Sequence, residues 1–124
     1  ILLMDDNEML LSTNRKALEQ LGYAVLTCIN GDECIRIYQQ RLLEGRKIDL
    51  VVLDLTIPGG MGGMETIGQL LLIDPMVRAI VSSGYTSGDT MAEYRRSGFR
   101  AILPKPYQIT QLAETVREVL TGDA

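Results

Sequence analysis

The sequence predicts an α/β fold in which a parallel sheet of five strands carries helices on both faces. Over 124 residues, short apolar runs alternate with segments of helical periodicity, which gives five strand–helix units. The third run, residues 49–53, is apolar almost throughout, as in a parallel strand that is covered on both faces. The chain length and an apolar fraction of 46% fit a single domain with its own core.

Each expected strand is one of the short apolar runs. These runs occupy residues 1–4, 24–28, 49–53, 78–82 and 100–103. They are too short to cross a membrane, so we expect no membrane contact by this segment. The crossover connections between the parallel strands should be right-handed.

The expected helices lie between the strands and after the last one. Apolar residues at helical spacing mark residues 7–21, 32–44 and 109–120, with the clearest pattern in the last of these segments. Met64, Ile67, Leu70 and Leu71 mark a further helix, and Met91 and Tyr94 mark a short one. Gly22 and Gly98 follow two of these helices, at positions where glycine commonly ends a helix.

The composition excludes several classes of function. The net charge is −4 and there is no basic stripe, so this segment is not expected to bind nucleic acid. The absence of histidine excludes histidine acid–base chemistry, histidine metal sites and a phosphohistidine on this chain. Cys28 and Cys34 are too few for a disulfide framework, and we expect both to pack as small apolar side chains in a reducing cytoplasm.

We expect residues 1–124 to form one domain taken from a longer protein. The chain begins at Ile1, already within a strand-like run, and shows no signal-peptide pattern. No linker or repeat interrupts the alternation of strands and helices. The one Gly-rich stretch, IPGGMGG at residues 57–63, is expected to be a mobile loop.

Polar residues stand at the carboxyl ends of four of the five expected strands. In order along the chain they are Asp5 and Asp6, Asp54, the stretch Ser82–Ser83–Gly84, and Lys105 between two prolines. If the strand order is 2-1-3-4-5, these four strands are neighbours about 4.8 Å apart. Their side chains would then share one pocket beyond the edge of the sheet.

Such a pocket favours phosphoryl chemistry with a metal ion. Three carboxylates close together repel one another, and a hard divalent cation relieves that repulsion. Oxygen ligands without His or Cys select Mg²⁺ or a similar ion. Lysine and hydroxyl groups suit phosphoryl oxygens, and Asp54, at the end of the middle strand, is placed to attack phosphorus and form an acyl phosphate.

Taken singly, each of these residues has a commoner structural role. An Asp after a strand often caps a helix or forms a turn, and a Ser there is more often a turn residue. Lys105 alone would usually be a solvated surface charge. All of them together, each at the carboxyl end of a strand, favour the functional interpretation.

Four segments together resemble the receiver domain of two-component response regulators. They are ILLMDDNE (1–8), LVVLDLTIPGGMGG (50–63), IVSSGY (80–85) and LPKPY (103–107). The family pattern is an acidic pair after the first strand, a phosphoacceptor Asp after the third, Ser or Thr after the fourth and Lys-Pro after the fifth. The resemblance covers the whole chain and implies a flavodoxin-like three-layer sandwich of strand order 2-1-3-4-5 with five helices.

The resemblance implies a role for each acidic residue. Asp54 receives the phosphoryl group from a phosphohistidine of a histidine kinase or of a histidine phosphotransfer domain. Asp6 and Asp54 bind Mg²⁺ through their side chains, the backbone carbonyl of Thr56 adds a third ligand, and Asp5 acts mainly through water. In such a domain the only catalysis is the domain's own phosphorylation and dephosphorylation.

Two further residues gain roles from the resemblance. Ser83, rather than Ser82, is expected to turn its hydroxyl toward the phosphate, because the family places a small residue directly after this position and Gly84 fills that place. Lys105 is expected to reach back to the acidic pocket. In such domains the bond between this lysine and the following proline is often cis, so we expect a cis peptide before Pro106.

Two features depart from the commonest family pattern. The switch aromatic of the fifth strand is replaced by Ile102, so the usual aromatic rotation is in doubt; Tyr85 or Phe99 are the possible substitutes, with packing as their commoner role. The loop after Asp54 is longer and richer in glycine, which allows either backbone approach to a phosphate or a partner or simple flexibility. This loop is similar to those of receivers attached to sensor histidine kinases, so we expect a hybrid kinase, with a stand-alone regulator as the alternative.

Two other functions compete with this interpretation. A haloacid-dehalogenase-like phosphatase also uses an Asp at a strand end with Mg²⁺, but it needs a second acid two residues later, where Thr56 stands. The second rival is a degenerate receiver that binds partners and is never phosphorylated. The complete set of pocket residues argues against it.

Overall fold

The computed structural model describes residues 1–84 and 91–122 and contains all ten predicted elements. The strands are β1 (Leu2–Met4), β2 (Leu26–Cys28), β3 (Val51–Asp54), β4 (Ala79–Ser83) and β5 (Ala101–Pro104). The helices are α1 (Glu8–Gln20), α2 (Gly31–Leu43), α3 (Gly63–Ile73), α4 (Met91–Ser97) and α5 (Ile109–Thr121). Strands and helices alternate throughout, which confirms the α/β class.

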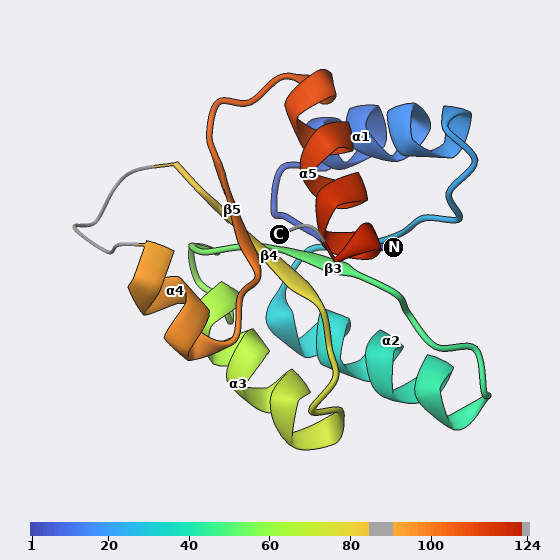
Figure 1. Cartoon of the computed structure of the whole chain (residues 1–124). Coiled ribbons are helices and arrows are strands. Elements are labelled where there is room, and N and C mark those ends of the chain that lie inside the picture. The colour runs from blue at the N-terminus through green and yellow to red at the C-terminus, as the bar shows by residue number, and fades with distance from the viewer. Residues whose placement is uncertain (85–90, 123–124) are drawn as a thin grey trace.

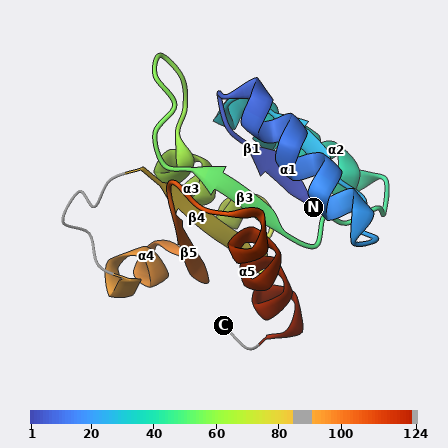
Figure 2. The ribbon, with the colours of Figure 1, turned by 90° about the horizontal axis from the view of Figure 1, so that it is seen from above.

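The five strands form one parallel sheet in the order β2-β1-β3-β4-β5, which confirms the predicted order. Helices α1 and α5 cover one face of the sheet, and α2, α3 and α4 cover the other (Figure 1). Seen from above, α1 and α5 lie in front of the sheet, α2 and α3 lie behind it, and the loop between β3 and α3 extends past the sheet (Figure 2). The carboxyl ends of β1, β3, β4 and β5 are therefore neighbours along one edge.

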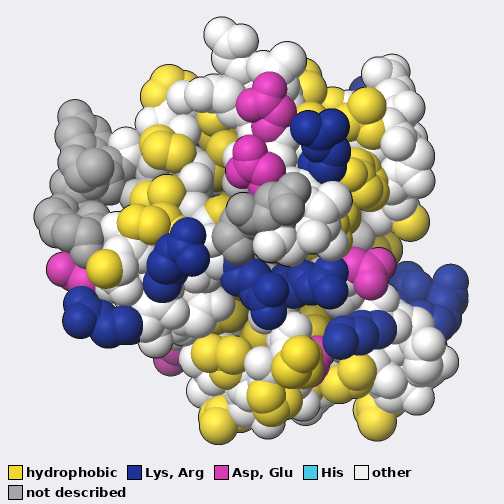
Figure 3. Space-filling view, viewed as in Figure 1, with side chains coloured by type: hydrophobic (Ala, Val, Ile, Leu, Met, Phe, Trp, Pro, Cys, Tyr) yellow, Lys and Arg dark blue, Asp and Glu magenta, His cyan; other side chains and the backbone are white. Residues whose placement is uncertain are grey.

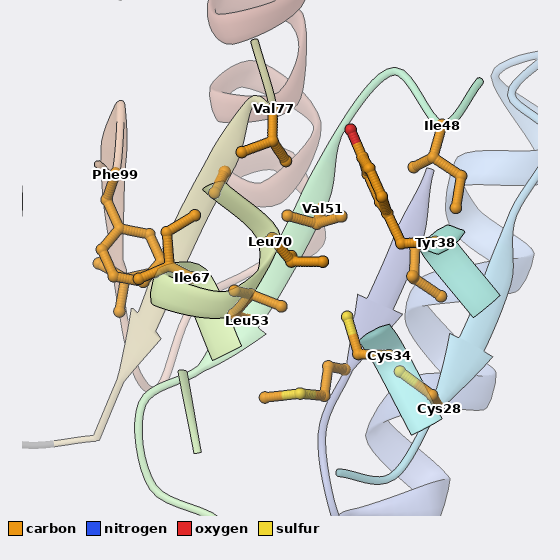
Figure 4. Close-up of a cluster of buried hydrophobic side chains, with 14 of the residues drawn as sticks. Cys28, Cys34, Tyr38, Ile48, Val51, Leu53, Ile67, Leu70, Val77 and Phe99 are labelled. Atoms are coloured by element: carbon orange, nitrogen blue, oxygen red, sulfur yellow. The ribbon is translucent and has the colours of Figure 1, made fainter. Parts of the chain in front are cut away.

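The core consists of two hydrophobic clusters, one on each face of the sheet. The cluster beneath α2, α3 and α4 includes Tyr38, Leu53 and Ile67, which are buried almost completely (Figure 4). The cluster beneath α1 and α5 includes Leu18 and Val116. Because β3 contributes to both clusters and all four of its residues are buried, the central strand is the one that the sequence predicted to be covered on both faces.

The helix boundaries follow from local sequence signals. Asn7 and Asn30 precede α1 and α2, and their side chains accept hydrogen bonds from the backbone N–H groups of Leu10 and Glu33. Caps of this kind typically stabilise a helix by about 1 kcal/mol. Beyond the helix ends, Gly22 and Gly98 adopt φ angles of 100° and 111°, in the region that favours glycine, as the two predicted stops require.

Some expectations about individual residues are wrong. Met64, assigned to the apolar face of its helix, is 44% exposed, because it lies in the first turn of α3 at the rim of the sheet. Val25 and Leu50 are buried as expected but lie just before β2 and β3, although the carbonyl of Leu50 still accepts from the N–H of Leu2 in β1 at 2.9 Å.

The surface seen in Figure 3 carries a band of Lys and Arg side chains across its middle, with apolar side chains exposed below it. Leu43, Leu72 and Met76, at and just beyond the ends of α2 and α3, are more than half exposed. Among the described residues, no helix has both the length and the apolar character that a membrane span requires.

Candidate functional site

Three carboxylates converge at the carboxyl edge of the sheet. Asp5 follows β1 directly and Asp54 is the last residue of β3, while Asp6 is the next residue along the chain from Asp5. Each of the three offers an oxygen atom within 4.8 Å of the others. Asp5 and Asp54 are 5% and 6% exposed, whereas Asp6 is open to solvent. The structure thus brings together the three acidic residues that the sequence singled out.

Lys105 points into this group of carboxylates from the loop after β5. Its Nζ atom lies 2.7 Å from Asp5 Oδ2 and 3.1 Å from Asp54 Oδ2. The backbone N–H of Lys105 donates to the carbonyl of Ser83 at 2.7 Å, which extends the pairing of β4 and β5 by one residue. The peptide bond between Lys105 and Pro106 is cis, the geometry that the resemblance implies at this position.

The charges of the site act strongly on one another because the groups are partly desolvated. Burial raises the pKa of Asp54, and the charge of Asp5 raises it further, while Lys105 acts in the opposite direction. Burial by itself would lower the pKa of Lys105, but its hydrogen bond to Asp5 and the two carboxylate charges raise it overall. The lysine is therefore a fixed cation beside a carboxylate that gains from a further positive charge.

Backbone N–H groups orient the two buried carboxylates. Asp5 Oδ1 accepts from the N–H of Asn7 at 2.9 Å, and Asp54 Oδ1 accepts from the N–H of Thr56 at 3.3 Å. In both side chains the second oxygen faces Lys105. The ligand role expected for the carbonyl of Thr56 stays a prediction.

Ser82 and Ser83 are both buried at the end of β4. Ser82 lies opposite Asp54 in the sheet, and its Oγ is buried without a hydrogen bond among the described residues. Ser83 is the last residue of the strand and lies opposite Pro104. Gly84 is exposed, and a Cβ at this position would meet no atom within 4 Å. The choice of Ser83 over Ser82 stays a prediction.

The residues considered as switch aromatics divide into three cases. Phe99 is 2% exposed and packs edge-to-face on Tyr94, with ring centroids 6.2 Å apart, which is a packing role. Ile102 is partly buried against the cluster beneath α2, α3 and α4. Tyr85 lies outside the described residues.

Two of the glycines after Asp54, Gly62 and Gly63, pack closely against backbone atoms of the same loop. A Cβ at Gly62 would overlap the carbonyl oxygen of Leu55, and one at Gly63 would lie 2.9 Å from the carbonyl oxygen of Asp54. The loop also reaches α2, because the N–H of Gly31 donates to the carbonyl of Met61 at 2.9 Å. These contacts show packing within the chain, and backbone approach to a phosphate or a partner stays a prediction.

Sequence reasoning missed a polar pair beside the site. Asn14 of α1 is 6% exposed, and its Nδ2 donates to the hydroxyl of Tyr107 at 2.8 Å. Two signals pointed to it: an amide within an otherwise apolar helix face, and a hydroxyl directly after the Lys105–Pro106 bond.

The residues of the site fit a hard divalent cation such as Mg²⁺. Their oxygens converge, two of the three carboxylates are buried together, and Lys105 offsets only part of their charge. Carboxylate and carbonyl oxygens are the ligands that Mg²⁺ prefers. The site therefore combines a set of carboxylates that can bind a metal ion with a lysine, Lys105, that points at Asp54. This combination suits the transfer of an anionic group to Asp54.

Comparisons with known proteins find relatives along nearly the whole chain. Sensor kinase CckA of Brucella abortus is 30% identical over 120 residues, which make up 97% of this chain and 12% of that protein. Sporulation initiation phosphotransferase F of Bacillus subtilis is 28% identical over 120 residues, which make up 97% of this chain and 92% of that protein. A chain in the crystal structure of the CheX–CheY–BeF₃–Mg²⁺ complex of Borrelia burgdorferi has the same fold, with a TM-score of 0.85, 22% identity and coverage of 95% of this chain and 86% of that one.

The family model assigns nearly the whole chain. The model of the response regulator receiver domain matches residues 1–117, from the start of the sheet into the last helix. The chain therefore belongs to the response regulator receiver domain family of two-component signalling.

Proposed function

We propose that this domain accepts a phosphoryl group on Asp54 from a phosphohistidine, with Mg²⁺ bound at the acidic edge. Receiver domains obtain their phosphoryl group from histidine kinases or phosphotransfer partners, and this chain has no histidine of its own to serve as donor. The observation that carries the proposal is the meeting of the Asp5, Asp6 and Asp54 oxygens within 4.8 Å, with Lys105 on Asp54.

Asp54 is the acceptor in this proposal because of its position and its partners. It ends the central strand, and its Oδ1 is held by the N–H of Thr56 while Oδ2 faces Lys105. A carboxylate oxygen attacks phosphorus, the bond from phosphorus to the donor's imidazole nitrogen breaks, and that nitrogen keeps the electron pair. Hydrolysis of the acyl phosphate by water then returns the carboxylate and releases inorganic phosphate.

Asp6 and Asp54 would hold Mg²⁺ directly, with the carbonyl of Thr56 as a third ligand and Asp5 acting through water. When bound, the ion neutralises charge on the phosphoryl oxygens. The convergence of the three carboxylates within 4.8 Å and the solvent exposure of Asp6 support this assignment. Lys105, already 3.1 Å from Asp54, would contact the phosphoryl group once it is in place.

The added charge on Asp54 would draw Lys105 and the hydroxyl of Ser83 inward and shift the surface formed by α4, β5 and α5. Ser83 and Lys105 are joined by a backbone hydrogen bond of 2.7 Å, so a displacement of either residue acts on the other.

We further propose that the parent protein is a hybrid kinase in the cytoplasm. The similarity to a sensor kinase of which this chain spans 12% supports that origin, and the two free thiols suit a reducing compartment.

The test is phosphorylation in solution. The domain is incubated with Mg²⁺ and acetyl phosphate, and intact mass is recorded for the wild type, for Asp54→Asn and for Asp49→Asn, an exposed carboxylate outside the acidic edge. We expect a phosphoryl adduct on the wild type and on Asp49→Asn and none on Asp54→Asn. An adduct on Asp54→Asn would mean a different acceptor. Failure of every phosphodonor on the wild type would indicate a receiver that acts by binding alone.

A further inference from the structure

The polar cluster of the site extends past the carboxylates toward α1 and α5. The parallel register places Ser82 opposite Asp54, so both side chains face the same side of the sheet. The residues two positions earlier in β1, β3 and β4 all belong to the cluster beneath α1 and α5; they are Leu3, Val52 and Ile80. Asp5, Asp54 and Ser82 therefore face the helix pair in which Asn14 lies.

The hydrogen bond from Asn14 to Tyr107 joins two distant parts of the chain, 93 residues apart. An unpaired buried amide costs about 1–3 kcal/mol, so the 2.8 Å bond accounts for an Asn between the apolar residues Leu11 and Leu18 of α1. The side chain of Tyr107 packs against the cluster beneath α1 and α5. Its ring is thus fixed by apolar contacts and its hydroxyl by a polar one.

Tyr107 holds a segment that has few backbone anchors. Lys105 donates its N–H to Ser83, and the next side-chain anchor along the segment is Gln108, whose N–H donates to Gln111 at 2.7 Å. Pro106 between them has no N–H to give. Among the hydrogen bonds of the described residues, the one from Asn14 ties this segment to α1.

The Tyr107 hydroxyl lies within electrostatic reach of the site. Burial raises the pKa of Tyr107, and the charge of Asp5 adds to this, while Asn14, Lys105 and Ser82 act in the opposite direction. The hydroxyl therefore stays protonated at neutral pH. Because its oxygen accepts from Asn14, its proton remains available for donation to a further acceptor.

We propose that Tyr107 and Asn14 are positioning residues. Their hydrogen bond fixes residues 105–108 against α1 and thereby orients the side chain of Lys105 toward Asp5 and Asp54. The inference rests on the proposed function, since the orientation of the Lys105 side chain determines whether it contacts a phosphoryl group on Asp54. The same bond passes a displacement of Lys105 to α1 when the site is filled.

The test uses Tyr107→Phe, which keeps the ring and removes the hydroxyl. In ¹⁵N NMR titrations with beryllofluoride and Mg²⁺, we expect about three- to tenfold weaker binding than in the wild type, the worth of one hydrogen bond. We also expect smaller shifts of the amide signals of α1. In the metal-free variant, the amide proton of Lys105 should exchange about three- to tenfold faster. Tyr23→Phe is the matched control, because Tyr23 packs against the same hydrophobic cluster.

A double variant separates positioning from stability. Tyr107→Phe leaves the buried Asn14 amide without its partner and lowers the melting temperature, whereas Asn14→Leu combined with Tyr107→Phe replaces both polar groups and restores it. If the pair only stabilises the fold, the double variant regains wild-type beryllofluoride affinity, which would overturn the inference. If the pair positions Lys105, the affinity stays about three- to tenfold weaker at a recovered melting temperature.

The wild type distinguishes failure of this inference from failure of the proposed function. A wild type that binds beryllofluoride, with Tyr107→Phe indistinguishable from it and from Tyr23→Phe, rejects the positioning role alone. A wild type that shows no response to beryllofluoride and Mg²⁺ rejects both.

Discussion

The ammonium of Lys105 lies closer to Asp5 than to Asp54, at 2.7 Å against 3.1 Å. The two contacts hold the lysine between the carboxylate that is expected to act through water and the one that is expected to be phosphorylated. Lys105 is therefore prepositioned before any phosphoryl group arrives, and the contact with Asp5 fixes its resting state.

Removing this cation should separate metal binding from the response to phosphorylation. In Lys105→Ala, Mg²⁺ should bind at least as tightly as in the wild type, because a positive charge leaves the carboxylates. Beryllofluoride should bind about tenfold or more weakly, since a charge-assisted hydrogen bond is worth about 1.5–3 kcal/mol. Isothermal titration calorimetry measures both affinities. Lys16→Ala, on the exposed surface of α1, is the control, and unchanged beryllofluoride affinity in Lys105→Ala would exclude its switch role.

Magnesium should stabilise the folded domain through the three carboxylates. We expect the melting temperature to rise with Mg²⁺ concentration, because an ion that binds the folded state alone shifts the unfolding equilibrium. The rise should disappear in Asp6→Asn and Asp54→Asn and persist in Asp49→Asn. Scanning fluorimetry with and without a chelator measures it. A rise in the melting temperature of Asp6→Asn equal to that of the wild type would show that Asp6 is not a Mg²⁺ ligand.

Acid should weaken the fold through Asp74, away from the functional site. The hydroxyl of Tyr38 donates to Asp74 Oδ2 at 2.6 Å, and this bond is the main reason that the pKa of Asp74 lies below its usual value. A carboxyl with a lowered folded-state pKa stabilises the protein above its unfolded pKa of about 3.9, and that contribution is lost as the pH falls through the folded value.

The comparison of two variants tests this acid dependence. Urea unfolding at about pH 6 and about pH 3 should show a smaller loss of the free energy of unfolding for Asp74→Asn than for the wild type. Asp49→Asn, at an exposed carboxylate, should follow the wild type. Equal losses in all three proteins would contradict the assignment.

Two glycines should respond in opposite directions to the same substitution. A Cβ at Gly31 would overlap Thr66 and Met61, so Gly31→Ala should destabilise the domain by about 1–3 kcal/mol. A Cβ at Gly68, within α3, would meet nothing within 4 Å, so Gly68→Ala should stabilise it by about 0.5–1 kcal/mol through helix propensity. Chemical denaturation of the two variants measures both effects. A stabilised Gly31→Ala would mean that the contact between the β3–α3 loop and α2 is loose.

The fold and the position of the site were predictable because both follow from the order of polar and apolar residues. Alternating apolar runs define a parallel sheet, and such a sheet gathers the residues after its strands at one edge. Asp5, Asp54 and Lys105 could therefore be grouped without coordinates. Strand limits were less accurate, since Val25 and Leu50 are buried within the predicted strands yet lie just outside β2 and β3.

What the sequence could not provide depends on packing between distant residues. The bond between Asn14 and Tyr107 spans 93 positions, and no local pattern specifies that α1 and the segment between β5 and α5 approach so closely. The purpose of the glycine-rich loop was open for the same reason. Only the approach of Gly62 to Leu55 and of Met61 to Gly31 distinguishes a packed loop from a flexible one.

The two thiols of the chain, on Cys28 and Cys34, are 2% and 0% exposed, on β2 and α2. A reagent such as a maleimide can reach them only when that side of the molecule opens. The rate of alkylation therefore reports how often β2 and α2 separate from the remaining sheet, and it does so without any label at the site of phosphoryl transfer.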